Sequence, residues 1–305
     1  MSIGSKLKKL LQEYKLYRIN SGPYKFLLQK LDSYPSIDVA SSIIESGYFR
    51  RNLVPLEINT TELKKIIVFA PHQDDEAIGC GGILSELSAL EYEIHIVFLT
   101  DGDSTDKTMK EVRHLEATKS INLLNAKMHE INISNVDFGV TQENIQDITS
   151  VIDSVQPDAI FTTWVLDAPS KHKLCNVILN VGLKHSAYVT NALPVYMYQV
   201  HTNLIPNMYF DYTHRFEEKQ KLIACHKSQM EIQNYKHLSA GLDAWNARIL
   251  PWSEDERYVE LYTVVPKEAF SGLVGMYEQN VNDTFDGNPV LIQAYNNLMK
   301  SEEIR

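Results

Sequence analysis

From residue 64 onward, hydrophobic and polar positions follow two alternating patterns. Short apolar runs rich in Ile, Val and Phe are typical of strands whose two faces are both buried. The longer segments between them repeat apolar residues at the spacing of a helix with one buried side. These patterns predict strands at 65–70, 94–100, 127–133, 158–163 and 195–199, and helices at 78–90, 107–125, 143–155 and 174–184.

The order of these elements predicts how they pack. Strands separated by helices pair in parallel, and right-handed crossovers place helices on both faces of the sheet. We therefore predict an α/β fold over about 62–200, with a doubly wound, mostly parallel, Rossmann-like sheet. Beyond residue 203 the pattern predicts a long helical stretch at 215–245, then an edge strand at 257–265 and two short helices.

The segments outside the alternating pattern suggest a division of the chain into three parts. The first 60 residues predict short helices interrupted at Gly22-Pro23, a dipeptide that favours turns. We expect a helical N-terminal extension (1–60), a main domain (61–270) and a C-terminal helical segment packed on that domain (271–305).

The composition is that of a globular protein. Of the 305 residues, 44% are hydrophobic and 22% are charged, which excludes disordered, collagen-like and coiled-coil classes. No stretch approaches the roughly 20 apolar residues that span a membrane, and the N-terminus lacks a signal-peptide pattern. The three cysteines lie far apart in the sequence, so neither a disulfide framework nor a thiolate zinc site is predicted. We expect a cytoplasmic protein.

Charge is unevenly distributed along the chain. The net charge of −10 argues against binding of nucleic acid over the whole surface. Residues 1–30 nevertheless carry a net charge of +6 in an amphipathic pattern. Two interpretations stay open for this segment: a solvated helix face packed on the main domain, or peripheral contact with an anionic membrane surface or a partner.

The first candidate site follows the strand at 65–70, where the chain reads Pro71-His72-Gln73-Asp74-Asp75-Glu76. A single carboxylate suffices to cap the helix that follows, and capping is the simplest interpretation. Three acidic groups crowded at one strand end repel each other unless a cation binds there. Because imidazole and carboxylate are both zinc ligands, we predict that His72 and Asp75 hold a zinc ion and leave Asp74 free.

At this point the sequence resembles a known family. The run Ala70–Glu76 is similar to the signature of the PIG-L (LmbE-like) zinc-dependent N-deacetylases, in which the first strand ends in Ala-His-Pro-Asp-Asp-Glu. Gln73 stands where the signature has its proline. In this family the histidine and the second aspartate hold zinc, and the first aspartate is the general base. The resemblance therefore implies a zinc site at His72 and Asp75, with Asp74 as the base.

The second candidate site, Thr100–Thr105, follows the strand at 94–100 and suits two chemistries. An Asp-x-Asp-x-Thr pattern is found in haloacid dehalogenase-like magnesium phosphatases, where Asp101 and Asp103 would be the nucleophile and a metal ligand. In the deacetylase family, Thr-Asp-Gly is followed by a helix with Arg-x-x-Glu, which Arg113 and Glu116 match. No acidic pair for a phosphatase follows a later strand, so we favour the deacetylase, with Asp101 and Arg113 shaping the pocket.

The third candidate site follows the strand at 158–163. In folds of this kind the remaining metal ligand comes from a distant strand end, and His172 is the histidine at that position. The family motif there is Asp-x-His-Pro-Asp-His, whose last histidine binds zinc. Asp167 and His172 match the motif, whereas Pro169 replaces its first histidine and Lys171 replaces its second aspartate.

The replaced histidine is the group credited in the family with stabilising or protonating the tetrahedral intermediate. Either another donor substitutes for it, or catalysis is impaired. His201 is the preferred substitute, ahead of Lys171 and His214. The substrate-binding residues that we predict are Asp101, Arg113, Asp167 and Lys171.

Two later segments, Lys219–Gln229 and Val259–Tyr262, also resemble family motifs. The resemblance implies a Zn²⁺-dependent hydrolase that removes the N-acetyl group of an N-acetylglucosamine-type sugar or its conjugate, in glycan, glycolipid or small glycoside biosynthesis. Two alternatives are a magnesium phosphatase using Asp101 and Asp103, and a catalytically impaired metal-binding homologue. Neither the sugar nor the oligomeric state follows from the sequence.

Overall fold

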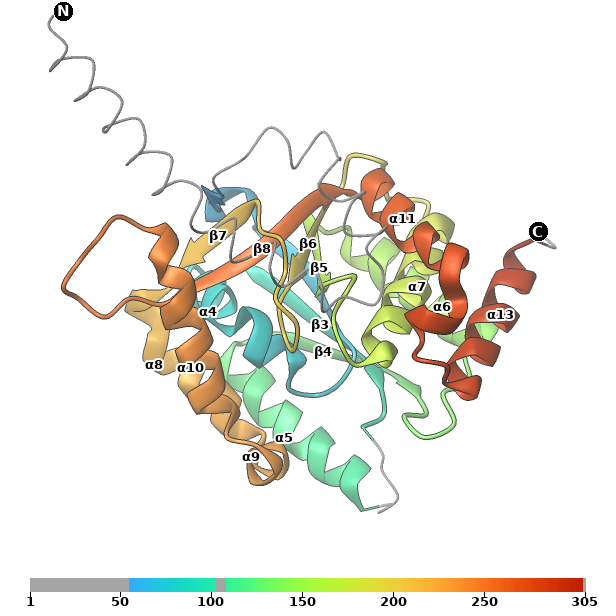
Figure 1. Ribbon diagram of the computed structural model, residues 1–305, viewed down its shortest axis with the longest axis horizontal. Helices are drawn as coiled ribbons and strands as arrows, with labels where there is room; N and C mark the ends of the chain where they lie inside the picture. The colour runs from blue at the N-terminus through green and yellow to red at the C-terminus, as the bar shows by residue number, and fades with distance from the viewer. Residues whose placement is uncertain (1–54, 103–107, 304–305) are drawn as a thin grey trace, which may run out of the picture.

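The computed structural model describes residues 55–102 and 108–303 (Figure 1). Within these residues, eight strands form one sheet in the order β1-β7-β8-β6-β5-β2-β3-β4. All neighbouring strands pair in parallel except for β8, which is antiparallel to both β6 and β7. The strands are β1 (Leu56–Glu57), β2 (Lys65–Ala70), β3 (Glu93–Thr100), β4 (Lys127–Ile133), β5 (Ala159–Thr163), β6 (Pro194–Tyr198), β7 (Met208–Asp211) and β8 (Val259–Pro266).

The helices lie in two layers, one on each face of the sheet (Figure 1). One layer contains α4 (Asp75–Ala89), α5 (Met109–Leu123), α8 (Phe216–Cys225), α9 (Lys227–Ile232) and α10 (Tyr235–Asn246). The other contains α6 (Gln142–Val155), α7 (Ser170–His185), α11 (Lys267–Gly275), α12 (Val281–Thr284) and α13 (Pro289–Glu303). Short 3-10 turns are η1 (Thr60–Glu62), η2 (Thr213–Arg215), η3 (Ala247–Ile249) and η4 (Met276–Asn280).

Alternate residues of each central strand supply the two hydrophobic cores. In β2, Ile67 and Phe69 face the core under α6 and α7, whereas Ile66 and Val68 face the core under α4, α5 and α8. Because successive side chains of a strand point to opposite faces, a strand buried on both sides must be apolar throughout. This is why the central strands were recognisable as continuous apolar runs. The predicted mixed α/β sheet with helices on both faces is confirmed.

The C-terminal half departs from the predictions in its strands. The strand predicted at the edge of the sheet is β8, which lies between β6 and β7, so that prediction is wrong. The strand β7 was not predicted, and it separates β8 from the short edge strand β1. A four-residue strand is too short to show a clear periodicity, which explains why it was missed.

The helices of this half also differ from the pattern. The helical stretch predicted at 215–245 consists of three helices, α8, α9 and α10, separated at His226 and Gln233. Residues 276–298 pack against α7 with Tyr277, Phe285 and Leu291, all of which are buried. The division into three domains stays a prediction, and the predicted N-terminal helices lie outside the described residues. In the described part of the chain, no helix is long and apolar enough to cross a membrane.

The strand order reverses direction between β2 and β5. From β2 the chain proceeds outward to β3 and β4, and from β5 it proceeds the other way to β6. At such a point the loops that follow two neighbouring strands diverge to opposite faces and leave a crevice at the carboxyl ends. The segments that follow β2 and β5, including the first turns of α4 and α7, carry His72, Asp75 and His172.

Candidate metal centre and active site

The loop from β2 into α4 holds two of the predicted ligands in a fixed relation. Asp75 is the first residue of α4, and its Oδ2 accepts the backbone N–H of His72 at 2.8 Å. Asp74, at the helix N-cap, has φ 148°, a backbone conformation that is strained for a residue with a side chain. Such strain persists at functional sites when the surroundings hold it. Here the Glu76 carboxylate accepts the Asp74 backbone N–H at 3.2 Å.

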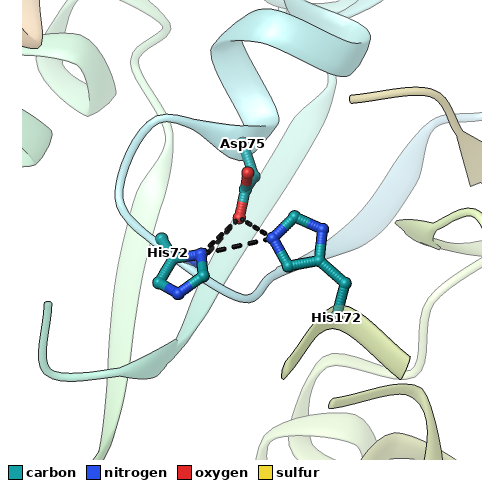
Figure 2. Close-up of side chains that lie close together, drawn as sticks. All are labelled: His72, Asp75 and His172. Atoms are coloured by element: carbon teal, nitrogen blue, oxygen red, sulfur yellow. Dashed lines mark hydrogen bonds and ion pairs between the residues drawn. The ribbon is translucent and has the colours of Figure 1, made fainter. Parts of the chain in front are cut away.

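His172 completes the group from the other side of the crevice. It lies in the first turn of α7, which begins at Ser170, four residues before the predicted start. Figure 2 shows the three side chains converging: His72 Nδ1 lies 3.2 Å from Asp75 Oδ2, and His172 Nε2 lies 3.4 Å from that oxygen and 3.3 Å from His72 Nδ1. The side chains of Asp75 and His172 are 2% and 0% exposed.

These distances suit a tetrahedral ion. Zinc bonds of about 2.0–2.1 Å in tetrahedral geometry place neighbouring ligand atoms about 3.3 Å apart, as the three atoms are here. Within the described residues, this trio is the cluster of potential ligands close enough to hold a metal. Three protein ligands leave a fourth position for water or substrate, which is the arrangement of catalytic rather than structural zinc sites.

The hydrogen bonds on the outer side of each imidazole decide which nitrogen is available to a metal. Asp167 Oδ2 lies 2.9 Å from His172 Nδ1 and, as a carboxylate, can only accept a hydrogen. His172 therefore donates through Nδ1 and presents the lone pair of Nε2 to the other two ligands. Asp167 is fully buried and also accepts the backbone N–H groups of His201 and Thr202, so it contacts His172 and the following loop.

His72 is oriented in the same manner by Asn135, a residue that the sequence analysis did not single out. Asn135 Oδ1 lies 3.2 Å from His72 Nε2, and Lys171 Nζ donates to the same Oδ1 at 3.0 Å and to the Asn135 carbonyl oxygen at 2.6 Å. Asn135 follows β4, the neighbour of β3, by two residues. The rule that sites form at the carboxyl ends of strands would have found it.

The buried charges of the site shift several pKa values. Burial, followed by repulsion from Asp75, raises the pKa of Asp74 to about 8. Burial alone would raise the pKa of Asp75 as well, but the charge of His172 and the hydrogen bond from His72 outweigh burial and hold it below its usual range. Burial lowers the pKa of His72. The neighbouring carboxylates Asp75 and Asp167 overcome burial and raise the pKa of His172.

Residues of α5 and α9, together with His226 between α8 and α9, lie next to the segment that carries Asp74. Arg113 Nη2 donates to Gln229 Oε1 at 2.6 Å, and Glu116 accepts hydrogen bonds from the backbone and hydroxyl of Ser228 at 2.9 and 2.7 Å. The buried ring of His226 lies 3.5 Å from the Glu76 carboxylate. The segment at 219–229 thus supports the loop that carries Asp74.

The predicted substitute donors lie at different distances from the three ligands. The His201 ring is exposed and its centroid is 5.4 Å from that of His172 and 6.4 Å from that of Tyr235. His214 instead pairs with Glu86, near the far end of α4, at 2.9 Å. Of the two histidines, only His201 therefore lies beside a predicted metal ligand, His172.

Asp101, one of the two residues of the phosphatase alternative, is not part of the His72, Asp75 and His172 cluster. Asp101 Oδ1 accepts the Asn135 backbone N–H at 3.0 Å, and its Oδ2 lies 3.8 Å from Lys110 Nζ. Asp103 lies outside the described residues. Asp101 therefore supports the Asn135 loop at the rim of the same site.

Comparison with known proteins agrees with this geometry. The model of the PIG-L family, described as GlcNAc-PI de-N-acetylase, matches residues 67–181, from within β2 to most of α7, and includes all three predicted ligands. The resemblance to the PIG-L family inferred from the sequence motifs is thus confirmed as a match over residues 67–181. The match does not favour a magnesium phosphatase, because it assigns the region around Asp101 to a different family.

Two kinds of relative accompany the PIG-L match. The diacetylchitobiose deacetylase of Thermococcus kodakarensis is 30% identical over 107 residues, which are 32% of this chain and 40% of that protein. The chain thus aligns with less than half the length of this curated relative. The N,N'-diacetylchitobiose deacetylase of Pyrococcus horikoshii has a similar solved structure, with a TM-score of 0.59 and 21% identity over 76% of this chain and 94% of that one.

A second solved structure shows that this fold is not restricted to one reaction. GalB, the 4-carboxy-2-hydroxymuconate hydratase of Pseudomonas putida KT2440, has a TM-score of 0.57 and 19% identity over 66% of this chain and 96% of that one. At such identities the likeness concerns the fold alone. The function must therefore be argued from the side chains of the PIG-L segment.

Proposed function

We propose that this protein is a zinc-dependent hydrolase that removes the N-acetyl group of an N-acetylglucosamine-type amino sugar or its conjugate. The observation that carries the proposal is the convergence of His72, Asp75 and His172 beside the buried carboxyl of Asp74. The PIG-L match and the deacetylase relatives support the choice of an acetamide as substrate.

The three ligand atoms and their orientation define the metal site. His72 Nδ1, Asp75 Oδ2 and His172 Nε2 would hold the ion, and Asp167 would position His172 rather than touch substrate. Zn²⁺ bound there supplies a Lewis acid for the acetamide carbonyl and lowers the pKa of water. The buried surroundings of Asp75 and His172 exclude other water from the ligands.

Asp74 is the proposed general base and, later, general acid. It lies next to a ligand without belonging to the trio. Burial raises the pKa of this carboxyl, which makes its ionised form a stronger base, suited to accept a proton from the attacking water and return it to the departing amine. Proton transfer by a positioned side chain typically contributes about 10²–10⁴-fold to the rate.

His201, at the open side of the site, is the proposed donor to the oxygen on which negative charge develops. Its exposed ring beside His172 is near enough to act when substrate is bound. Arg113, Lys171 and Asp101 are the proposed substrate contacts. We further propose a cytoplasmic enzyme of glycan, glycolipid or small glycoside biosynthesis, with peripheral membrane contact through the basic residues 1–30.

The deciding experiment measures zinc content and release of acetate from N-acetylglucosamine, its oligomers and its conjugates. Asp74→Asn should retain one zinc per chain and lose about 10²–10⁴-fold in turnover. His172→Ala should lose both zinc and turnover, whereas His237→Ala, which changes an exposed histidine on α10, should keep both. Purified protein without zinc would contradict the metal site. Protein with zinc but without turnover on any acetamido sugar would indicate an impaired homologue.

A further inference from the structure

We propose that Lys171 and Asn135 act together as positioning residues that set the tautomer of His72. The inference rests on the proposed metal site, but it does not depend on which substrate the enzyme uses. It assigns a function to two residues outside the trio of ligands, one at the start of α7 and one after β4.

The first step is the orientation of the Asn135 amide. Lys171 Nζ lies 3.0 Å from Asn135 Oδ1 and 2.6 Å from the carbonyl oxygen of the same residue. An ammonium group has three hydrogens to donate and cannot accept, so an oxygen rather than the amide nitrogen must face it. Lys171 thus prevents the amide from turning over.

The second step concerns the hydrogen on His72. The oriented Oδ1 lies 3.2 Å from His72 Nε2 and can only accept, so the hydrogen resides on Nε2. The lone pair of His72 is then on Nδ1, the atom that faces Asp75 and His172. Asp75, at 3.2 Å from Nδ1, favours the opposite tautomer, in which a hydrogen on Nδ1 blocks metal binding. Asn135 counteracts this preference only while its oxygen faces the ring.

Helix stability does not explain why a lysine stands at position 171. The first turn of α7 contains no acidic residue and begins Ser170-Lys171-His172-Lys173, although the positive end of the helix dipole disfavours cations there. A residue that breaks a local rule commonly serves a site. Here the ammonium group contacts a loop that is 36 residues away in sequence and bonds to its amide oxygen.

The experiment compares Zn²⁺ affinity, measured by competition with a chelator, in four full-length proteins. These are the unaltered protein, Lys171→Met, Asn135→Asp and the double variant. Lys171→Met should bind zinc about tenfold or more weakly, in the range typical of groups that orient metal ligands. If the charge of Lys171 acted only by repelling the cation, its removal would strengthen binding, so the sign separates the two explanations.

The Asn135→Asp background isolates the effect of orientation. A carboxylate presents an oxygen in either orientation, so it no longer needs Lys171 to keep one facing His72. Lys171→Met should therefore change zinc affinity by less than about twofold in that background, a non-additivity expected of residues that act as a unit. An equal loss in both backgrounds, or no loss in Lys171→Met alone, would overturn the proposal. Lys171→Arg keeps donors and should retain affinity if Lys171→Met proves unstable.

A spectroscopic readout keeps this inference separable from the proposed function. Nitrogen-15 NMR of the metal-free protein, with His72 assigned by His72→Gln, reports which ring nitrogen carries the hydrogen. Lys171→Met should move that hydrogen toward Nδ1 in His72 and leave His172, which is held by Asp167, unchanged. An unchanged His72 spectrum would contradict the proposal even if zinc bound well. If the unaltered protein bound no zinc, the proposed function would fail while this spectrum still decided the inference.

Discussion

Replacing Lys219 by methionine tests the buried charge network that holds α4, α8, α10 and β8 together. The Lys219 side chain is 0% exposed, and its Nζ lies 2.8 Å from both Asp243 Oδ2 and Glu260 Oε1. Glu260 in turn accepts the backbone N–H groups of Gly82 and Ile83 at 2.7 and 3.0 Å. These donors lie just after Cys80, where α4 departs from helical geometry, so the network stabilises the helix that begins with Asp75.

The expected loss of unfolding free energy follows from the groups that stay buried after the substitution. Methionine fills most of the volume, but both carboxylates lose their shared cation while they stay buried. Breaking a buried ion pair on one side typically costs about 3–5 kcal/mol, and the other hydrogen bonds of Glu260 argue against a larger figure. Lys127→Met is the control, because that lysine is 64% exposed and pairs with Glu93 at the surface, where the cost is about 0–1 kcal/mol.

Urea unfolding at several pH values measures the effect and its cause. Burial and the neighbouring Glu260 raise the pKa of Asp243 even with Lys219 present. A carboxyl whose pKa is higher in the folded state destabilises the fold as the pH rises from the unfolded-state pKa to the folded-state pKa. The loss of unfolding free energy in Lys219→Met should therefore shrink as the pH is lowered from neutral toward acid. A loss below about 1 kcal/mol at neutral pH, or one that grows toward acid, would refute the reasoning.

Two further predictions use other contacts. Asp167→Asn retains the shape of the side chain but can present a donor to His172 Nδ1. Zinc affinity should therefore fall about 10–100-fold, while the unfolding midpoint changes little. Unchanged zinc affinity would show that Asp167 does not orient the ligand. Gly79→Ala should destabilise the fold by about 1–3 kcal/mol, because the added methyl group would lie 2.2 Å from the Tyr198 ring. The control, Gly241→Ala on α10, has open space around the added methyl group and should stabilise the fold by about 0.4–1 kcal/mol. Equal unfolding midpoints of the two variants would contradict both assignments.

The local pattern of the sequence determined the elements that carry the first two ligands. The apolar run of β2 is unambiguous because both of its faces are buried, and the carboxyl end of such a strand is where polar side chains gather. His72 and Asp75 are only three residues apart, so the turn between strand and helix is sufficient to bring them together. The same reasoning predicted the parallel half of the sheet.

Other features depend on contacts between segments that are distant in the chain. His172 joins His72 from 100 residues away because β5 pairs with β2, and Asn135 reaches His72 because β4 pairs with β3. Strand order is set by packing and crossover geometry, and the residues of one strand do not specify its neighbour. Local periodicity therefore identified β2, β3 and β5. It did not identify residues such as Asn135, whose contact with the site depends on how these strands pair.

The place of β8 shows most clearly what only the tertiary structure decided. A strand with the charged residue Glu260 in its second position reads as one that lies at the edge of the sheet. In the fold, Lys219 from α8 and the N–H groups of Gly82 and Ile83 from α4, which lies in the same helical layer, all bond to the Glu260 carboxylate. The carboxylate is therefore paired, and the strand lies inside the sheet. A buried charge is tolerated only with partners, and the partners of Glu260 are 41, 177 and 178 residues away in the sequence. The sequence determined which residues are charged, and the tertiary structure decided which of those charges are paired and buried.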